Sequence, residues 1–455
     1  MDQLDFRGRR REYVLILFML GTLTLVLNGL RPFNLGIPLS DILYLLALVF
    51  LVFDGMGREE PSSQWMPLHF YWLPALAILL GGLLSSINSA SPLISIFVTL
   101  KISYLFSLWM SMIIAMVRTK GGVENAIAAL IVGVVFTSAV AVLDSLTGMA
   151  LGPRIYGLDP KLSGLDPLLY SQTSGRLSGT LGHPNHLGQI TAVALPIICD
   201  RAMVFLGEKR AGYRGLMLVA AAILVFWANL LSGSISGLIG ATVGMTIVVG
   251  LRIRRNNYHF RILRLFLLGA GAVLVVGLFI ELKKPDSGGL SYWLATNVQR
   301  VITITGPGRI SLVHDALEEI ARNPIVGYGM DQGTFGANPS SAVLAIGIHN
   351  TILQGWLGGG LLTFIGVLLV YSKTMHMALR ALIEQLRQPS TSYTLGLAAS
   401  IVGWVLIDMT SPSISIRWTW LTVGLLYGTM IKERKEFLPR WIEPHTGRVT
   451  SKASD

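Results

Sequence analysis

The sequence predicts an all-α polytopic membrane protein with about twelve transmembrane helices. Of its 455 residues, 52% are hydrophobic and only 13% are charged, too few for the surface of a soluble protein of this length. Apolar runs close to the roughly 20 residues that cross a bilayer recur along the whole chain. Backbone groups in lipid must be hydrogen-bonded internally, so these runs are expected to be helices. No long linker or repeat separates them, and residues 1–455 are therefore expected to form one membrane domain.

The expected spans are short but numerous, and the seventh and eighth are joined only by Ser232-Gly233-Ser234. The first run resembles a signal peptide, but it is long and lacks a small-residue cleavage site, so it is expected to remain as a helix. In order, the twelve spans are Tyr13–Leu30, Ile37–Phe53, Leu68–Ile87, Leu93–Val117, Val123–Leu143, Leu187–Phe205, Leu216–Leu231, Ile235–Leu251, Leu265–Leu282, Thr351–Tyr371, Tyr393–Met409 and Trp418–Ile431.

The positive charges predict the orientation. The net charge is +11, and most Lys and Arg residues fall in alternate connections, on the same side as the arginine-rich first tail. The positive-inside rule makes that side cytoplasmic, so both termini are expected in the cytoplasm. Basic residues in short loops between spans suit contact with anionic membrane lipids, and they do not suggest nucleic-acid binding.

With this topology, two connections on the outer side are long: a first outer loop over 146–186 and a larger one over 283–348. Long ordered loops are uncommon unless they serve a function. In the first loop, Asn185 is expected to cap the sixth span after Pro184. A cap does not explain Arg176, which follows Gly175 near that helix start, as in many anion sites.

The larger loop contains an amphipathic helix over 309–322, expected on the outer membrane surface or against other helices. Its apolar face is expected to consist of Ile310, Val313, Leu317 and Ile320, and its polar face of Asp315, Glu318, Glu319 and Arg322. Arg309 stands at its start, where a cation opposes the helix dipole; an anionic partner or snorkelling toward lipid phosphate would explain it. After Pro324 comes the turn Gly327-Tyr328-Gly329, where backbone could approach a ligand closely. The loop ends in His349-Asn350, at the mouth of the tenth expected span.

These segments, in this order, resemble the O-antigen ligase and O-antigen polymerase family, most clearly from Arg176 to Tyr371. The resemblance implies a GT-C-like fold and an inverting, metal-independent glycosyltransferase in the bacterial cytoplasmic membrane. The implied donor is a glycan on undecaprenyl diphosphate at the outer face. The implied acceptor is a sugar hydroxyl of a glycan or a lipid-linked molecule, in surface polysaccharide biosynthesis.

The candidate residues suit this chemistry. A departing lipid diphosphate requires cations, for which Arg176 and Arg309 are candidates. The acceptor hydroxyl must lose a proton, and His349 is the candidate base, with Asn350 orienting the ring or the sugar. The remaining polar residues of the first loop, Asn185, His183 and His186, are expected as structural or acceptor contacts. Acidic residues of the outer loops are scattered, so no metal or other cofactor is expected.

The sequence departs from the family in two places. Where the family carries an arginine near the end of the seventh span, this chain has Ile235. Lys101 or Arg417 could supply the missing charge, although Lys101 could instead pair with Asp41 or Asp408, or snorkel. The second departure is Gly358-Gly359-Gly360, which replaces an acidic residue and is expected to permit close helix packing.

A transporter or flippase of a lipid-linked glycan is the alternative, because many spans and an intramembrane lysine suit either class. Transporters tend to show inverted repeats and helices broken at mid-membrane. The sequence shows no such symmetry, and its polar candidates gather on the outer side, which favours an enzyme.

Overall fold

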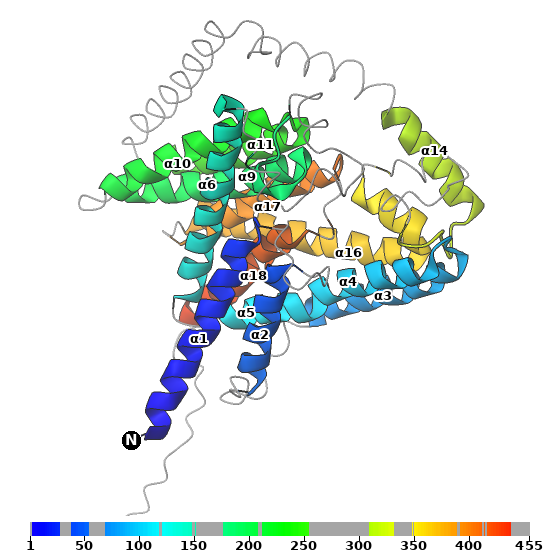
Figure 1. The fold of residues 1–455 in the computed structure, drawn as a ribbon, viewed down its shortest axis with the longest axis horizontal. Coiled ribbons are helices and arrows are strands. Elements are labelled where there is room, and N and C mark those ends of the chain that lie inside the picture. The colour runs from blue at the N-terminus through cyan, green and yellow to red at the C-terminus, as the bar shows by residue number, and fades with distance from the viewer. Residues whose placement is uncertain are drawn as a thin grey trace, which may run out of the picture.

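The computed structural model describes residues 2–27, 38–53, 69–117, 121–147, 151, 176–207, 212–253, 309–331, 348, 350–388, 392–411, 414 and 416–437, with the backbone alone at 2–11, 51–53, 69–70, 309–311 and 432–437. Within these residues the chain forms helices and turns, and none of them lies in a strand. Figure 1 shows long helices that cross one another at steep angles. The helices are α1 (Asp2–Thr24), α2 (Leu39–Phe53), α3 (His69–Ser85), α4 (Pro92–Tyr104), α5 (Met110–Val117), α6 (Gly122–Thr147), α9 (Pro184–Gly207), α10 (Gly212–Leu231), α11 (Ile235–Ile253), α14 (Arg309–Arg322), α16 (Thr351–Arg387), α17 (Thr394–Asp408) and α18 (Arg417–Phe437).

The described residues have the character of a helical multi-pass membrane protein. Seven helical segments among them are long and apolar enough to cross a membrane; α4 and α5 form one such segment, joined by the π-helical turn Leu105–Trp109. The expected first, second and eleventh spans are shorter apolar helices. The expected ninth span, Leu265–Leu282, lies outside the described residues.

Helix α9 is the centre of one group of helices, because almost every residue from Leu187 to Val204 is buried. It packs between α10, α11 and α17. A Cβ added to Gly237 of α11 would lie 2.7 Å from the Gly188 carbonyl oxygen of α9, so only glycine permits this approach. From α10, the Asn229 amide donates to the Gly188 carbonyl at 3.1 Å. Small residues thus bring the α9 and α11 backbones together, as is usual between helices in membranes.

Near its carboxyl end, α9 is held by a buried ion pair and a cation–π contact. Asp200 is fully buried and forms an ion pair with Arg252 of α11 at 2.6 Å. The neighbouring Arg201 guanidinium lies 4.2 Å from the centre of the Tyr393 ring, just before α17. These contacts join α9, α11 and α17 at the end remote from Asn185.

Helix α16 is not one continuous helix. Gly360 has φ 67° and ψ −166°, a conformation essentially restricted to glycine. A Cβ built on Gly355 would lie 3.6 Å from the Cβ of Val367, although twelve residues of continuous helix would separate them by about 18 Å. The Trp356 and Phe364 rings also stack, with centroids 4.4 Å apart. The chain therefore folds back at Gly360 into a short arm (351–359) and a long arm (361–387), and the expectation of one continuous span over Thr351–Tyr371 is wrong.

A distant segment of backbone fills the break in α16. A helix that stops and restarts leaves N–H and C=O groups without helical partners, and burying them unpaired is costly. Residues 325–329 provide partners for three of these groups. The hydrogen bonds run from Tyr328 N to Leu357 O (2.9 Å), from Gly329 N to Gly358 O (2.8 Å) and from Leu361 N to Ile325 O (3.0 Å).

The glycines expected to permit close packing are confirmed in that role, although much of the contact is with this turn. A Cβ on Gly360 would lie 2.1 Å from the Ile325 carbonyl oxygen, and one on Gly327 would lie 2.6 Å from the Gly360 nitrogen. Gly327 and Gly329 have positive φ values of 77° and 104°. The Gly327-Tyr328-Gly329 turn therefore brings backbone close to the broken helix, by the conformational freedom noted in the sequence.

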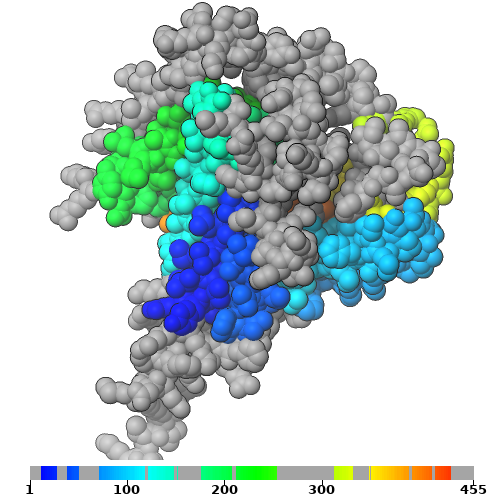
Figure 2. Space-filling model, viewed as in Figure 1, coloured from blue at the N-terminus to red at the C-terminus, as the bar shows by residue number. Residues whose placement is uncertain are grey.

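Helix α14, over Arg309–Arg322, packs against the short arm and is not isolated on a membrane surface. Its buried face consists of Ala316 and Ile320, which join Ile348 and Leu357 in a small apolar cluster. Val313 and Leu317, expected on the same face, are 37% and 47% exposed. Conversely Glu319, expected on the polar face, is only 7% exposed. The buried face of α14 is therefore rotated about the helix axis relative to the predicted apolar face. Figure 2 shows α14 at the surface beside α3 and α4.

Candidate functional site

The start of α9 differs from the expected cap. The helix begins at Pro184, which lacks an N–H and suits the first helical position. His183 precedes it, and its Nδ1 accepts a hydrogen bond from the Asn185 N–H at 3.1 Å. His183 is therefore the cap, and the expectation that Asn185 caps this helix is wrong. Because Nδ1 is the acceptor, His183 is neutral in this arrangement.

The Asn185 side chain instead receives Arg176. The Arg176 Nη2 donates to Asn185 Oδ1 at 2.5 Å, and its Nε donates to the Ser232 carbonyl at 2.9 Å. The Leu177 N–H adds a backbone bond of 3.1 Å to Leu231. Arg176 is thus fixed between the start of α9 and the turn from α10 to α11. Both acceptors are neutral, so neither contact neutralises the guanidinium charge.

This contact bears on the departure at Ile235. Ile235 is the first residue of α11, three positions after Ser232. Arg176 therefore reaches the turn at which the family resemblance places an arginine, but it does so from another segment. Arg176 and the departure at Ile235 can both be recognised in the sequence, but only the fold shows that they are close together.

Two histidines and a lysine lie next to this arginine. The rings of His183 and His186 are 5.3 Å apart between centroids, and His186 lies 5.8 Å from the Trp418 ring of α18. The Lys101 ammonium of α4 interacts electrostatically with His186. Lys101, which is half-buried, therefore lies near the start of α9. Arg176, His183, His186 and Lys101 form one group, called the Arg176 group below.

Asn350 caps the short arm of α16. Its Oδ1 accepts from the N–H groups of Ile352 and Leu353 at 3.0 and 3.1 Å, and its Nδ2 donates to the Met409 carbonyl at 3.3 Å. Thr351 adds a hydrogen bond of 2.9 Å to Asp408. The tip of the arm is therefore attached to the carboxyl end of α17.

The same end of α17 also contacts α9. The Gln189 amide donates to the carbonyl and hydroxyl oxygens of Ser411 at 3.1 and 3.0 Å. Gln189 lies one helical turn after Asn185, so the starts of α9 and of the short arm both contact residues 409–411. The structure thus brings Asn350 into the neighbourhood of the Arg176 group.

The fold-back separates Asn350 from the bend. Nine residues of short arm correspond to about 13 Å of helix, and they run back along the long arm from the bend at Gly360. Asn350 therefore lies beside the carboxyl end of α17, away from the bend.

Arg417 is engaged elsewhere. Its guanidinium forms a two-pronged ion pair with Asp41 of α2, and both side chains are mostly buried. This carboxylate neutralises Arg417, which makes it a poor replacement for the arginine absent at Ile235. Of the two carboxylates considered for Lys101, Asp41 pairs with Arg417 and Asp408 accepts from Thr351.

Two predicted residues are placed only in part. His349 lies outside the described residues, between the described Ile348 and Asn350. Arg309 is described by its backbone alone, as the first residue of α14. Helix α14 runs parallel to the short arm in Figure 1, and the Trp356 indole joins their carboxyl ends by donating to the Pro324 carbonyl at 3.0 Å. The amino ends of α14 and of the arm therefore point the same way.

In the part of the chain that the structure describes, no group of three or more His, Cys, Asp or Glu side chains has a metal-binding arrangement. Neither a family model nor a curated protein sequence matches this chain. The resemblance to O-antigen ligases and polymerases therefore rests on the ordered motifs themselves.

Proposed function

We propose that this chain is a membrane glycosyltransferase of the O-antigen ligase and polymerase type. It transfers a glycan from undecaprenyl diphosphate to a sugar hydroxyl at the outer face of the bacterial cytoplasmic membrane, with both termini in the cytoplasm. The observation that carries the proposal is the gathering of Arg176, Lys101 and the start of α9 with the Asn350-capped arm. Cations and helix amino ends suit a diphosphate leaving group.

In this proposal Arg176 stabilises the charge that develops on the departing diphosphate. Its guanidinium is held in place by Asn185 and Ser232, so little reorganisation accompanies binding. Lys101 contributes a second positive charge, and Arg309 approaches from α14. His349, one residue before the cap of the short arm, takes the proton of the acceptor hydroxyl.

The transporter alternative gains one argument from the broken helix α16, since interrupted helices line transporter sites. In those sites the freed backbone groups face the substrate. Here residues 325–329 hydrogen-bond to the freed groups of Leu357, Gly358 and Leu361. A backbone break that is filled by protein favours the enzyme over a transport pathway.

The His349→Ala variant tests the proposal. It should lower glycan transfer by about 10²- to 10⁴-fold, the usual contribution of a general base, while lipid-diphosphate binding remains. His314→Ala is the matched control, because the His314 side chain is 72% exposed on α14. Transfer by purified protein supplied with a lipid-linked glycan is the measurement. Normal product from His349→Ala would remove this residue from the mechanism.

Deleting the gene distinguishes the two family activities. Loss of a polymerase leaves single repeat units on the acceptor, whereas loss of a ligase leaves polymer on its lipid carrier. Unchanged surface glycan in the deletion strain would count against both.

A further inference from the structure

The short arm of α16 is held in place by tertiary contacts, because the break at Gly360 removes the rigidity of a continuous helix. Its tip is attached to α17 through Asn350, and its base depends on the turn at 325–329. The contacts that hold this turn in place therefore also set the direction of the short arm.

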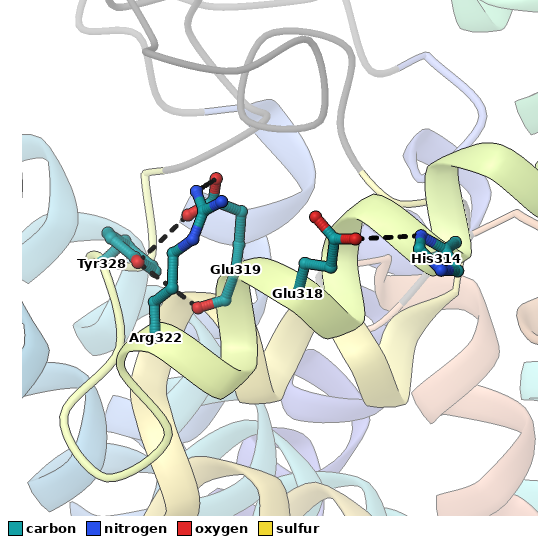
Figure 3. Close-up of polar contacts among 5 residues, drawn as sticks. All are labelled: His314, Glu318, Glu319, Arg322 and Tyr328. Carbon is teal, nitrogen blue, oxygen red and sulfur yellow. Dashed lines mark hydrogen bonds and ion pairs between the residues drawn. The ribbon is translucent and has the colours of Figure 1, made fainter.

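Tyr328 links the turn to α14. Its N–H donates to the Leu357 carbonyl of the arm. Its hydroxyl donates to the Glu319 carboxylate at 3.1 Å and, at 3.3 Å, to the Glu319 main-chain carbonyl (Figure 3). Burial and the hydrogen bond to Glu319 raise the pKa of Tyr328, so the hydroxyl keeps its proton and remains a donor. Tyr328 thus adds a hydrogen-bonded connection between α14 and the broken helix, beside the apolar contacts of Ala316 and Ile320 with Leu357.

Glu319 is a buried acceptor at this junction. It is 7% exposed, and its other oxygen accepts from Arg322 at 2.7 Å. Arg322 is 65% exposed, so its pair with Glu319 is largely solvated. Figure 3 shows the Arg322 guanidinium next to the Glu319 carboxylate and the Tyr328 hydroxyl directed toward Glu319. The more buried contact, to Tyr328, is the one that constrains the turn.

The rest of the turn is anchored independently. The Asn323 and Asn88 amides both donate to the Gly327 carbonyl, at 2.7 and 3.2 Å. Ser89 donates to Asp331 at 2.6 Å. The turn is therefore attached to the corner between α3 and α4 and to the residue that follows α14, and Tyr328 adds a side-chain contact within α14 itself.

We propose that Glu319 and Tyr328 are positioning residues: their hydrogen bond sets the short arm, and hence Asn350, relative to the Arg176 group. The catalytic consequence rests on the proposed glycosyltransferase function. The structural consequence, that the hydrogen bond holds the short arm in position, does not depend on that function. The two are tested by separate measurements.

The arm position is measured with a cysteine pair, Gly355→Cys with Val367→Cys. Their Cβ atoms lie 3.6 Å apart in the folded-back arrangement, within the range of disulfides, and the native Cys199 is buried. In a glutathione redox buffer, the full-length protein in detergent should form this disulfide. Failure of the otherwise unaltered pair to form it would overturn the proposal.

Glu319→Ala in this cysteine background should lower the disulfide equilibrium constant about tenfold, since a buried hydrogen bond to a charged group contributes about that factor. Glu319→Gln keeps an acceptor for Tyr328, so its disulfide equilibrium constant should be close to that of the protein with Glu319. Arg322→Ala is the matched control and should change little. Tyr328→Phe, which removes only the hydroxyl, should reproduce Glu319→Ala if the alanine variant does not fold.

Glycan transfer provides the second measurement. Without the cysteine pair, Glu319→Ala should lower kcat severalfold and leave the donor KM near that of the unaltered protein, with rescue by Glu319→Gln. An equal loss in Glu319→Gln and Glu319→Ala, or no change in either the disulfide equilibrium or kcat, would overturn the positioning role. If the unaltered protein transfers no glycan, the proposed function fails, while the disulfide equilibrium still decides how the arm is held.

Discussion

At the residue scale, the candidate site is defined by the hydrogen-bond and ion-pair partners of its polar side chains. His183 caps α9, and this leaves the Asn185 amide to hold Arg176. Arg417 has a similar charge but is neutralised by Asp41. Asn185 and Ser232 orient the Arg176 guanidinium, and in the proposed function this orientation serves to stabilise charge on a diphosphate.

Arg176→Ala should therefore lower glycan transfer by about 10²-fold or more, the typical effect of removing a preorganised group that stabilises transition-state charge. Arg176→Lys should recover only part of it, because an ammonium cannot bridge Asn185 and Ser232 as the planar fork does. Transfer rates and lipid-diphosphate binding are the measurements.

Arg214 is the control for this prediction, since it is an arginine at the opposite end of α10 whose Nε donates to the exposed Tyr213 hydroxyl. Arg214→Ala should leave transfer unchanged. Equal activity of Arg176→Ala and Arg214→Ala would show that Arg176 has no part in donor recognition.

At the scale of elements, α16 has the most unusual construction. Its composition is that of an ordinary span, yet Gly360 reverses the chain and the 325–329 turn completes the hydrogen bonding. Gly358 and Gly360 lie against the backbone of the turn and Gly359 lies against the Thr363 side chain, so the role of these glycines is steric and conformational.

Gly360→Ala should destabilise the protein by about 3 kcal/mol, because alanine disfavours this conformation and its Cβ would lie 2.1 Å from the Ile325 carbonyl oxygen. Gly250→Ala in α11 is the control, since nothing lies within 4 Å of an added Cβ there. The midpoint of thermal unfolding in detergent measures both. An unchanged midpoint for Gly360→Ala would contradict the fold-back.

At the scale of the whole molecule, the parts of the candidate site are expected on one side of the membrane. The positive-inside rule predicts that the start of α9, the tip of the short arm and the amino end of α14 lie on the outer side. The buried Asp200–Arg252 pair joins the opposite end of α9 to α11. This arrangement suits an enzyme that works at one interface.

Cysteine labelling tests the orientation. Arg322→Cys on α14 should react with a membrane-impermeant thiol reagent in intact spheroplasts, whereas Arg380→Cys on the long arm of α16 should react only after permeabilisation. These side chains are 65% and 52% exposed, so accessibility alone does not separate them. Cys199 is buried and should stay unlabelled. Labelling of both variants from outside would refute the predicted topology.

Part of the candidate site follows from local sequence. Arg176 near a Pro-Asn helix start and Asn350 ahead of an apolar run are recognisable as polar residues at helix starts. Which side chain caps each helix was not predicted correctly, since His183 caps α9 and Asn350 caps the short arm. The pairing of Arg176 with Ser232 and of Arg417 with Asp41 joins residues 56 and 376 positions apart. No local pattern contains that information.

The sequence by itself determined the helical membrane class, because the length and apolarity of each run decide whether a segment can lie in lipid. It also determined the range of the amphipathic helix, since Pro324 ends it soon after Arg322. Only the tertiary structure decided that α16 folds back at Gly360 and which face of α14 is buried. A helix can stop within an apolar run only when other groups satisfy its freed backbone. Here those groups belong to the turn at 325–329, which lies outside any local sequence pattern of α16.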